Sequence, residues 1–108
     1  MSFNILRTQA FSNHLKLLAK KYPSIKKDYE QLLQELASNH AAGISLGKNC
    51  YKIRMNIASK KRGKSGGARV ITYLKIEDKK ITLLDIYYKA GKDSISEKEL
   101  IELLKKAE

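Results

Sequence analysis

With 108 residues, 43% of them hydrophobic, the chain is long enough for one modest core, so we expect a single domain over residues 1–108. The 22 Lys and Arg outnumber the 11 Asp and Glu and give a formal net charge of +11, which favours a polyanionic partner, nucleic acid before a membrane surface. No apolar run is long enough to span a membrane, no signal peptide or lipidation motif is found, and the single Cys50 excludes an intrachain disulfide. We expect a cytoplasmic protein.

The N-terminal part of the chain carries two stripes of apolar side chains at helical spacing. The first stripe runs from Phe11 to Tyr22 and is interrupted by Pro23, because proline has no backbone N–H for a helix interior. The second runs from Ile25 to Leu36. We expect the two helices to form a hairpin.

In the middle of the chain the apolar spacing changes to every second residue, as in a β-strand. Residues 51–57 place apolar side chains on one face and Lys52 and Arg54 on the other. Two more strands are expected over residues 68–76 and 80–88, which are rich in Val, Ile, Thr, Tyr and Leu and are separated by polar turn residues.

The C-terminal end is predicted to be a helix. Ser96 and Glu99 have the spacing of a capping box, and Ile95 with Leu100 fits a hydrophobic staple around it. Residues 2–7 could add an edge strand. The order β-α-α-β-β-β-α segregates helices from strands, which indicates an α+β fold with an N-terminal helical hairpin packed on a small antiparallel sheet.

Acidic residues are absent between Leu36 and Ile76. The cations of this segment are Lys48, Lys52, Arg54, Lys60, Lys61, Arg62, Lys64, Arg69 and Lys75. Surfaces built only for solubility mix both signs of charge, whereas a field of one sign attracts polyanions. We therefore predict that this segment binds nucleic-acid phosphates.

The basic segment contains two kinds of position. Lys52, Arg54 and Arg69 lie on predicted strands, which hold side chains rigidly enough for catalysis. The stretch 59–67 has no apolar residue and three glycines, so it is expected to be a mobile loop that makes adaptable contacts to RNA. The residues assigned to RNA or ribosome binding are Lys48, Lys60, Lys61, Arg62 and Lys64.

The residue types limit the chemistry. No cluster of Asp and Glu suits a two-metal nuclease, and His14 and His40 are expected to be ordinary surface or cap residues, so no metal or other cofactor is expected. Cleavage of RNA needs a group that takes the 2′-OH proton, cations that stabilise the phosphorane and a donor to the 5′-oxygen. Lys, Arg and Tyr must supply these groups; Tyr87 and Lys89 share a parity near the end of the last strand.

Three motifs together resemble the RelE/ParE superfamily of bacterial toxins, and most closely its HigB-like branch. They are the Lys-x-Arg strand at Lys52 and Arg54, the basic glycine-rich segment that ends at Arg69, and the run from Ile86 to Lys89. The likeness covers about residues 48–104, and the helical hairpin agrees with it in kind and position.

The resemblance implies the toxin of a type II toxin–antitoxin system, a ribosome-dependent endoribonuclease that cuts messenger RNA in the ribosomal A site without a metal. It implies as partners the ribosome with its 16S RNA and a small, more acidic antitoxin, often with a helix-turn-helix domain. It also implies catalytic positions at Lys52 and Arg54, a phosphate-stabilising Arg69, and a last catalytic position at Tyr87 or Lys89.

One departure from the family leaves the general base open. RelE has lysine at the position of Arg54, and arginine is a poor general base because it almost never loses its proton. Either Lys52 or a loop lysine takes that role, or orientation on the ribosome supplies most of the catalysis. Two other functions remain open as well: a ParE-like gyrase poison that acts by binding, and a non-catalytic RNA-binding module.

Overall fold

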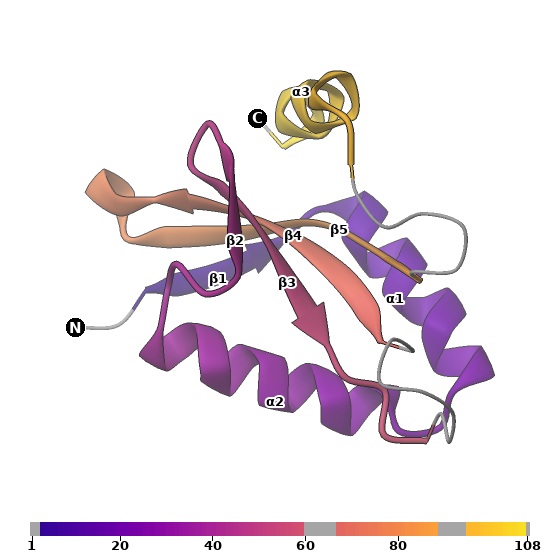
Figure 1. Cartoon of the computed structure of the whole chain (residues 1–108). Helices are drawn as coiled ribbons and strands as arrows, with labels where there is room; N and C mark the ends of the chain where they lie inside the picture. Colours follow the sequence, from indigo (N-terminus) through magenta and orange to yellow (C-terminus); the bar gives the residue numbers. More distant parts are fainter. Residues whose placement is uncertain (1–2, 60–66, 89–94, 108) are drawn as a thin grey trace.

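The computed structural model describes residues 3–59, 67–88 and 95–107 (Figure 1). Its elements in chain order are β1 (Asn4–Arg7), α1 (Gln9–Lys21), α2 (Ile25–Ser38), β2 (Ile44–Gly47), β3 (Cys50–Met55), β4 (Ala68–Lys75), the 3-10 helix η1 (Ile76–Asp78), β5 (Lys80–Tyr88) and α3 (Glu97–Lys106). The predicted α+β fold, with its helical hairpin and C-terminal helix, is confirmed.

The described strands form one mixed sheet in the order β1-β5-β4-β3-β2. The strands β2 to β5 pair antiparallel with their neighbours, whereas β1, the expected edge strand, pairs with β5 in parallel. The sequence pattern does not predict β2. This short strand is joined to β3 by a tight turn in which Lys48 and Asn49 have φ angles of 55° and 61°, as in the favoured two-residue hairpin turns.

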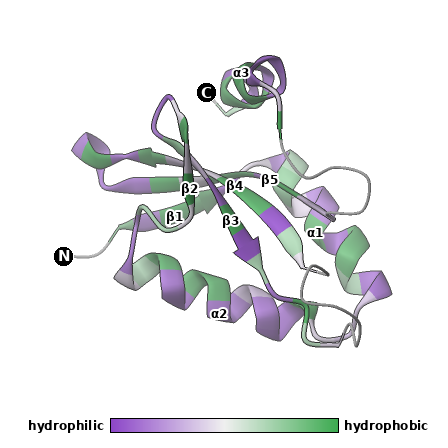
Figure 2. Ribbon diagram, viewed as in Figure 1, coloured by the Kyte–Doolittle hydropathy of each residue, from purple (hydrophilic) through white to green (hydrophobic). Residues whose placement is uncertain are grey.

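The helices cover the two faces of the sheet unequally. Figure 1 shows α1 and α2 on one side and α3 on the other. The ribbons of α1 and α2 alternate between green and purple (Figure 2), as expected for helices with one apolar face. At the start of α1 the Thr8 hydroxyl accepts the Phe11 N–H and donates to the Leu84 carbonyl, so this cap also ties the helix to β5.

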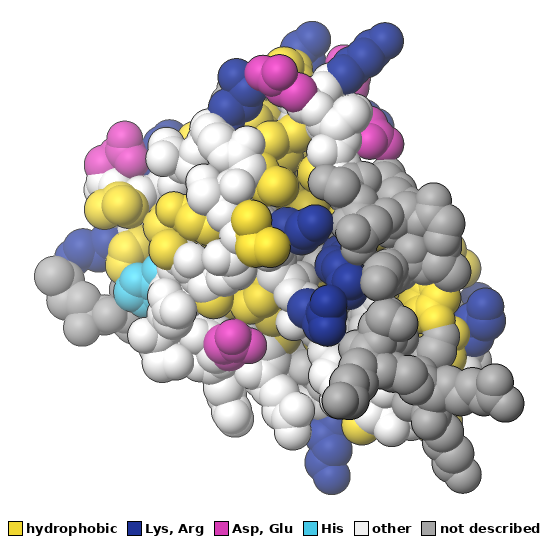
Figure 3. Space-filling view, viewed as in Figure 1, with side chains coloured by type: hydrophobic (Ala, Val, Ile, Leu, Met, Phe, Trp, Pro, Cys, Tyr) yellow, Lys and Arg dark blue, Asp and Glu magenta, His cyan; other side chains and the backbone are white. Residues whose placement is uncertain are grey.

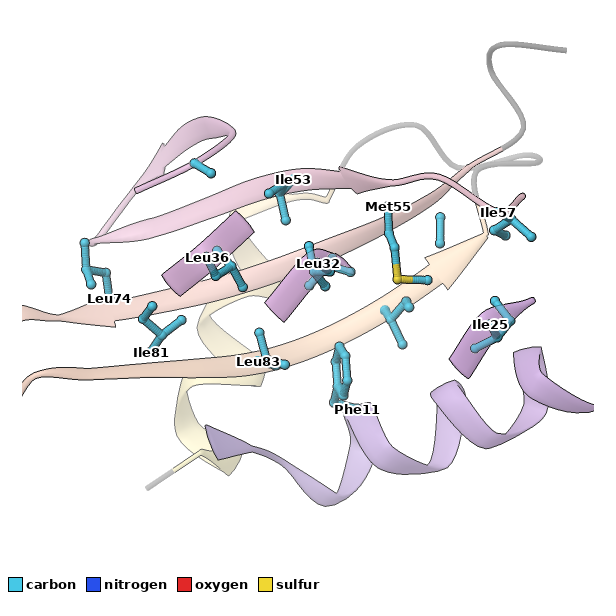
Figure 4. Close-up of a cluster of buried hydrophobic side chains, with 14 residues drawn as sticks. Phe11, Ile25, Leu32, Leu36, Ile53, Met55, Ile57, Leu74, Ile81 and Leu83 are labelled. Carbon is cyan, nitrogen blue, oxygen red and sulfur yellow. The ribbon is translucent and has the colours of Figure 1, made fainter. Parts of the chain in front are cut away.

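The larger apolar cluster lies between the helical hairpin and the sheet (Figure 4). Phe11 and Leu36 from the helices and Val70 and Leu83 from the sheet are fully buried. The burial of each such side chain contributes roughly 1.5–3 kcal/mol. Ile53, which the alternating pattern placed on the apolar face of β3, belongs to this cluster as predicted.

A smaller apolar cluster lies on the opposite face, where Cys50, Ile71 and Leu84 are covered by Leu100 of α3. The predicted capping box opens this helix: the Ser96 hydroxyl accepts the Glu99 N–H, and the Glu99 carboxylate accepts the Ser96 N–H. The sheet is therefore buried on both faces where α3 lies against it.

A buried carboxylate near the start of α2 holds the segment that follows β3. Asp28 is only 4% exposed and accepts the Ser24 hydroxyl at 2.7 Å and the Ala58 N–H at 3.2 Å. The Ser24 hydroxyl also accepts the Ser59 N–H at 2.8 Å. These bonds fix the backbone just before the glycine-rich stretch.

We expect Asp28→Ala to lower the free energy of unfolding by about 1–3 kcal/mol, because two donors lose a charged acceptor in a poorly hydrated place. Urea unfolding followed by circular dichroism measures the change. Glu30→Ala removes an exposed carboxylate from the same helix and should change stability by less than about 0.5 kcal/mol. Equal losses in the two variants would contradict the anchoring role.

Candidate nucleic-acid interface

Four of the predicted site residues lie together on the face of the sheet to which α3 belongs. Arg54 on β3 is directly opposite Arg69 on β4, and Arg69 is directly opposite Tyr87 on β5. Directly opposed residues point to the same face, and so does Lys52, two residues before Arg54. We call these four residues the cationic face. Figure 3 shows dark-blue Lys and Arg side chains gathered near the middle of the molecule in this view.

A β-bulge decides which way Tyr87 points. The register between β4 and β5 shifts by one residue at Leu84, which has no directly opposed partner. If the strands continued in the register of Thr72 with Leu83, without this shift, Tyr87 would lie opposite Ala68 and point toward α1 and α2, because side chains alternate with a period of two. With it, Tyr87 lies opposite Arg69, and Tyr88 packs against the larger apolar cluster instead.

Exposure falls from the rim of the cationic face to its centre. Arg54 is exposed, Lys52 and Tyr87 are half-buried, and Arg69 on the central strand is only 4% exposed. Like charges directly opposite one another in a sheet repel. An anion that contacts both Arg54 and Arg69 gains charge-assisted hydrogen bonds from two guanidinium groups. A phosphate group is the anion that this arrangement suits.

Two glycines let other backbone segments approach the strand that carries Lys52 and Arg54. A Cβ atom at Gly67 would lie 2.7 Å from the Met55 carbonyl oxygen and 3.3 Å from Cγ of Arg54. Gly43 has a φ of 101°, and a Cβ atom there would overlap the Lys52 carbonyl. A side chain at either glycine would displace β3 or its neighbour, so both positions help to set where the cationic face lies.

Of the other predicted binding residues the structure describes only Lys48, which lies away from this face. Lys48 lies at the turn between β2 and β3, where its Nζ is 3.8 Å from the Glu97 carboxylate. About 13 Å of strand separates Cys50, beside this turn, from Arg54. The remaining predicted site residues, Lys60, Lys61, Arg62, Lys64 and Lys89, lie outside the described residues.

His14 has a carboxylate partner that the sequence analysis missed. Its Nδ1 lies 2.6 Å from Oδ1 of Asp85, and the same oxygen accepts the Ile86 N–H at 2.9 Å. His14 is therefore more than an ordinary surface or cap residue, because it joins α1 to β5. Its partner Asp85 lies two residues before Tyr87 on that strand. No local pattern could have linked two residues that are 71 positions apart.

Cys50 is fully buried in the smaller apolar cluster. Burial disfavours the thiolate and raises the pKa of this thiol to about 11, although the nearby charge of Lys48 acts in the opposite direction. Because the thiolate is the nucleophilic form, Cys50 is a packing residue near neutral pH.

We expect thiol reagents to modify Cys50 at least about a hundredfold more slowly in the folded protein than in the unfolded chain, since a pKa of about 11 instead of 9.0 leaves roughly a hundredth of the thiolate. The folded state also holds this proton more tightly. The resulting stability is present below pH 9 and is lost as the pH rises toward 11. Modification rates with and without denaturant test the burial, and equal rates would contradict it.

Within the described ranges, no three His, Cys, Asp or Glu side chains lie close enough together to hold a metal ion. The helices of the same part of the chain are all too short or too polar to cross a membrane.

Comparison with known proteins identifies the fold. No protein-family model and no curated protein matches the sequence. Among solved structures, a free-state double mutant of the E. coli toxin RelE matches with a TM-score of 0.61 and 17% sequence identity. The match covers 99% of this chain and 95% of that chain. The protein thus has the RelE fold, and at this identity the likeness concerns the fold alone.

Proposed function

We propose that this protein is the toxin of a type II toxin–antitoxin system, of the HigB-like branch of the RelE/ParE superfamily, and that it acts in the cytoplasm as a ribosome-dependent endoribonuclease. A single domain over residues 1–108 would carry this activity. The observation that supports it best is the row of Arg54, Arg69 and Tyr87 across three strands of a RelE-like sheet, with Lys52 beside it.

In the proposed reaction, the 2′-oxygen of one nucleotide attacks the adjacent phosphorus. The new bond joins the 2′-oxygen to phosphorus, and the bond to the 5′-oxygen breaks, which leaves a cyclic phosphate and a 5′-hydroxyl end. Arg69 and Arg54 would stabilise the charge of the phosphorane, as preorganised cations do best in a partly buried site. The substrate binds between a fixed arginine and an accessible one.

Two protons must also move. One leaves the 2′-hydroxyl, and one reaches the 5′-oxygen. Lys52 is the described residue best suited to accept the first, because Arg54 almost never loses its proton. Tyr87, whose hydroxyl is buried beside Arg69, or Lys89, outside the described residues, would donate the second, and the Tyr87 ring could instead stack on a base.

The proposed partners are those that the likeness to the RelE/ParE superfamily implies, and the net charge of +11 agrees with a nucleic-acid partner. Messenger RNA in the ribosomal A site would lie on the cationic face. Lys48 and the basic residues Lys60, Lys61, Arg62 and Lys64 would contact 16S ribosomal RNA through its phosphates. A small acidic antitoxin, often one with a helix-turn-helix domain, would neutralise the toxin.

We expect Arg69→Gln and Lys52→Ala each to slow cleavage of ribosome-bound messenger RNA by about 10²–10³-fold, because each removes a group that acts on the transition state. Induction of the wild-type protein should arrest growth, and the double variant should not. The double variant Lys20→Ala with Lys27→Ala removes the same charge from exposed positions on α1 and α2 and should remain toxic. Circular dichroism verifies that each variant folds.

Primer extension on messages from induced cells separates the alternatives. Discrete cuts within translated frames support the endoribonuclease. Growth arrest without such cuts would instead favour a gyrase poison, and harmless induction would favour a non-catalytic RNA-binding module. Full toxicity of a folded double variant of Lys52 and Arg69 would overturn the proposed site.

Phosphate contact by the cationic face also predicts a salt dependence. Each phosphate contact to single-stranded RNA contributes about 0.7 to the slope of log affinity against log salt concentration. Arg54→Ala should lower that slope by about this amount, whereas Lys20→Ala should leave it unchanged. Fluorescence anisotropy of a labelled single-stranded RNA over a salt series measures both slopes. Identical slopes for Arg54→Ala and wild type would place the phosphates elsewhere.

A further inference from the structure

A small hollow lies beside the cationic face, between α2 and β3. Its volume is about 150 Å³. The buried side chains of Leu32 and Met55, 3% and 2% exposed, form its apolar floor. Its rim is polar and consists of Gln31, Glu35, Arg54 and Asn56, all of them exposed.

The hollow and the cationic face share one wall. Arg54 lines the hollow and is also the outermost arginine of the cationic face. The pairing of β2 with β3 ends at Lys52, so no described strand covers that edge of β3 beyond this residue. A nucleic-acid strand whose phosphate lies between Arg54 and Arg69 therefore has a recess within reach for one of its bases.

The chemistry of the rim does not suit a second phosphate. The Glu35 carboxylate repels anions, and within the described part of the chain it has no hydrogen-bond or ion-pair partner. A carboxylate accepts hydrogen bonds from an amino group of a base, as it does from cytosine N4 in DNA recognition. The Gln31 and Asn56 side chains each offer a donor and an acceptor for the rest of a base edge.

Size and shape point to the same ligand. The hollow is about half the volume of the smallest typical small-molecule pockets, so it holds one ring system rather than a longer ligand. A flat ring can pack on Leu32 and Met55 while its polar edge meets the rim, and the Arg54 guanidinium can stack on it from the side. Asp28, also at the hollow, is already engaged by Ser24 and Ala58.

We propose that this hollow binds one nucleobase that carries an exocyclic amino group, namely adenine, cytosine or guanine in preference to uracil, and so sets the sequence preference of the protein for RNA. The proposal rests on the proposed function only in that single-stranded RNA lies on the cationic face. Glu35 and Gln31 are the specificity-determining residues.

Binding of short RNAs to the full chain tests this inference without cleavage. The probes are labelled 2′-O-methyl pentauridines in which only the central base is varied, because the methyl group blocks attack by the 2′-oxygen. We expect the wild type to bind at least one amino-bearing base about tenfold more tightly than uracil, the usual scale for one well-made base contact.

Matched variants identify the hollow as the source of the preference. Glu35→Gln and Gln31→Ala should reduce the preference to about twofold or less. Glu30→Gln and Gln34→Ala make the same changes at exposed positions of α2 outside the hollow and should leave the preference intact. The Glu30 variant also controls for the general gain in RNA affinity when one negative charge is lost.

The inference is overturned if the wild type binds all four probes equally, or if the preference survives in the folded Glu35 and Gln31 variants. Its failure is separable from failure of the proposed function. If the protein prefers one base but never cuts RNA, base binding in the hollow is supported and the endoribonuclease activity is refuted. If it cuts RNA but shows no base preference, the activity is supported and base binding in the hollow is refuted.

Discussion

The structure depends on one constraint: a sheet with apolar side chains on both faces must find cover for both. The helical hairpin of α1 and α2 covers one face with buried side chains such as Phe11 and Leu36. The other face is covered by α3, whose ten residues span about 15 Å. The exposed Arg54 lies in the part of this face that α3 leaves accessible. The cationic face therefore occupies the polar remainder of a surface whose apolar part is used for packing.

Placing cations there has a cost for stability. Arg54 and Arg69 are opposed like charges, and Arg69 is nearly buried, where a charge is expensive to hold. The surrounding backbone fixes the position of the strand that carries Arg54. Gly67 packs its backbone against Arg54, and the Asp28 network fixes the chain just beyond β3. A bound polyanion would stabilise the folded state further, because it binds the folded state and not the unfolded chain.

Much of the architecture could be predicted from the sequence, because local patterns determine it. The alternation along β3 predicted that Lys52 and Arg54 lie on the face opposite the larger apolar cluster. The capping-box spacing of Ser96 and Glu99 predicted the start of α3. The parallel pairing of β1, the short β2 and the pair of His14 with Asp85 could not be predicted. The β1 pairing and the His14–Asp85 pair depend on contacts between distant parts of the chain, which leave no periodic signal, and β2 has only four residues, too few to show a period. The row of Arg54, Arg69 and Tyr87 needed the strand register as well.

Because of the bulge at Leu84, the composition of the site depends on the register of β5 against β4 as well as on side-chain identity. If β4 and β5 continued in the register of Thr72 with Leu83, the same residues would still pair, but the two faces of β5 would be exchanged beyond that point. Tyr87 would then be sealed beneath α1 and α2, and an aliphatic neighbour would meet Arg69. Deletion of the extra residue itself would straighten β5 and leave Tyr87 opposite Arg69, so a one-residue gap at this place in an alignment is compatible with the same site.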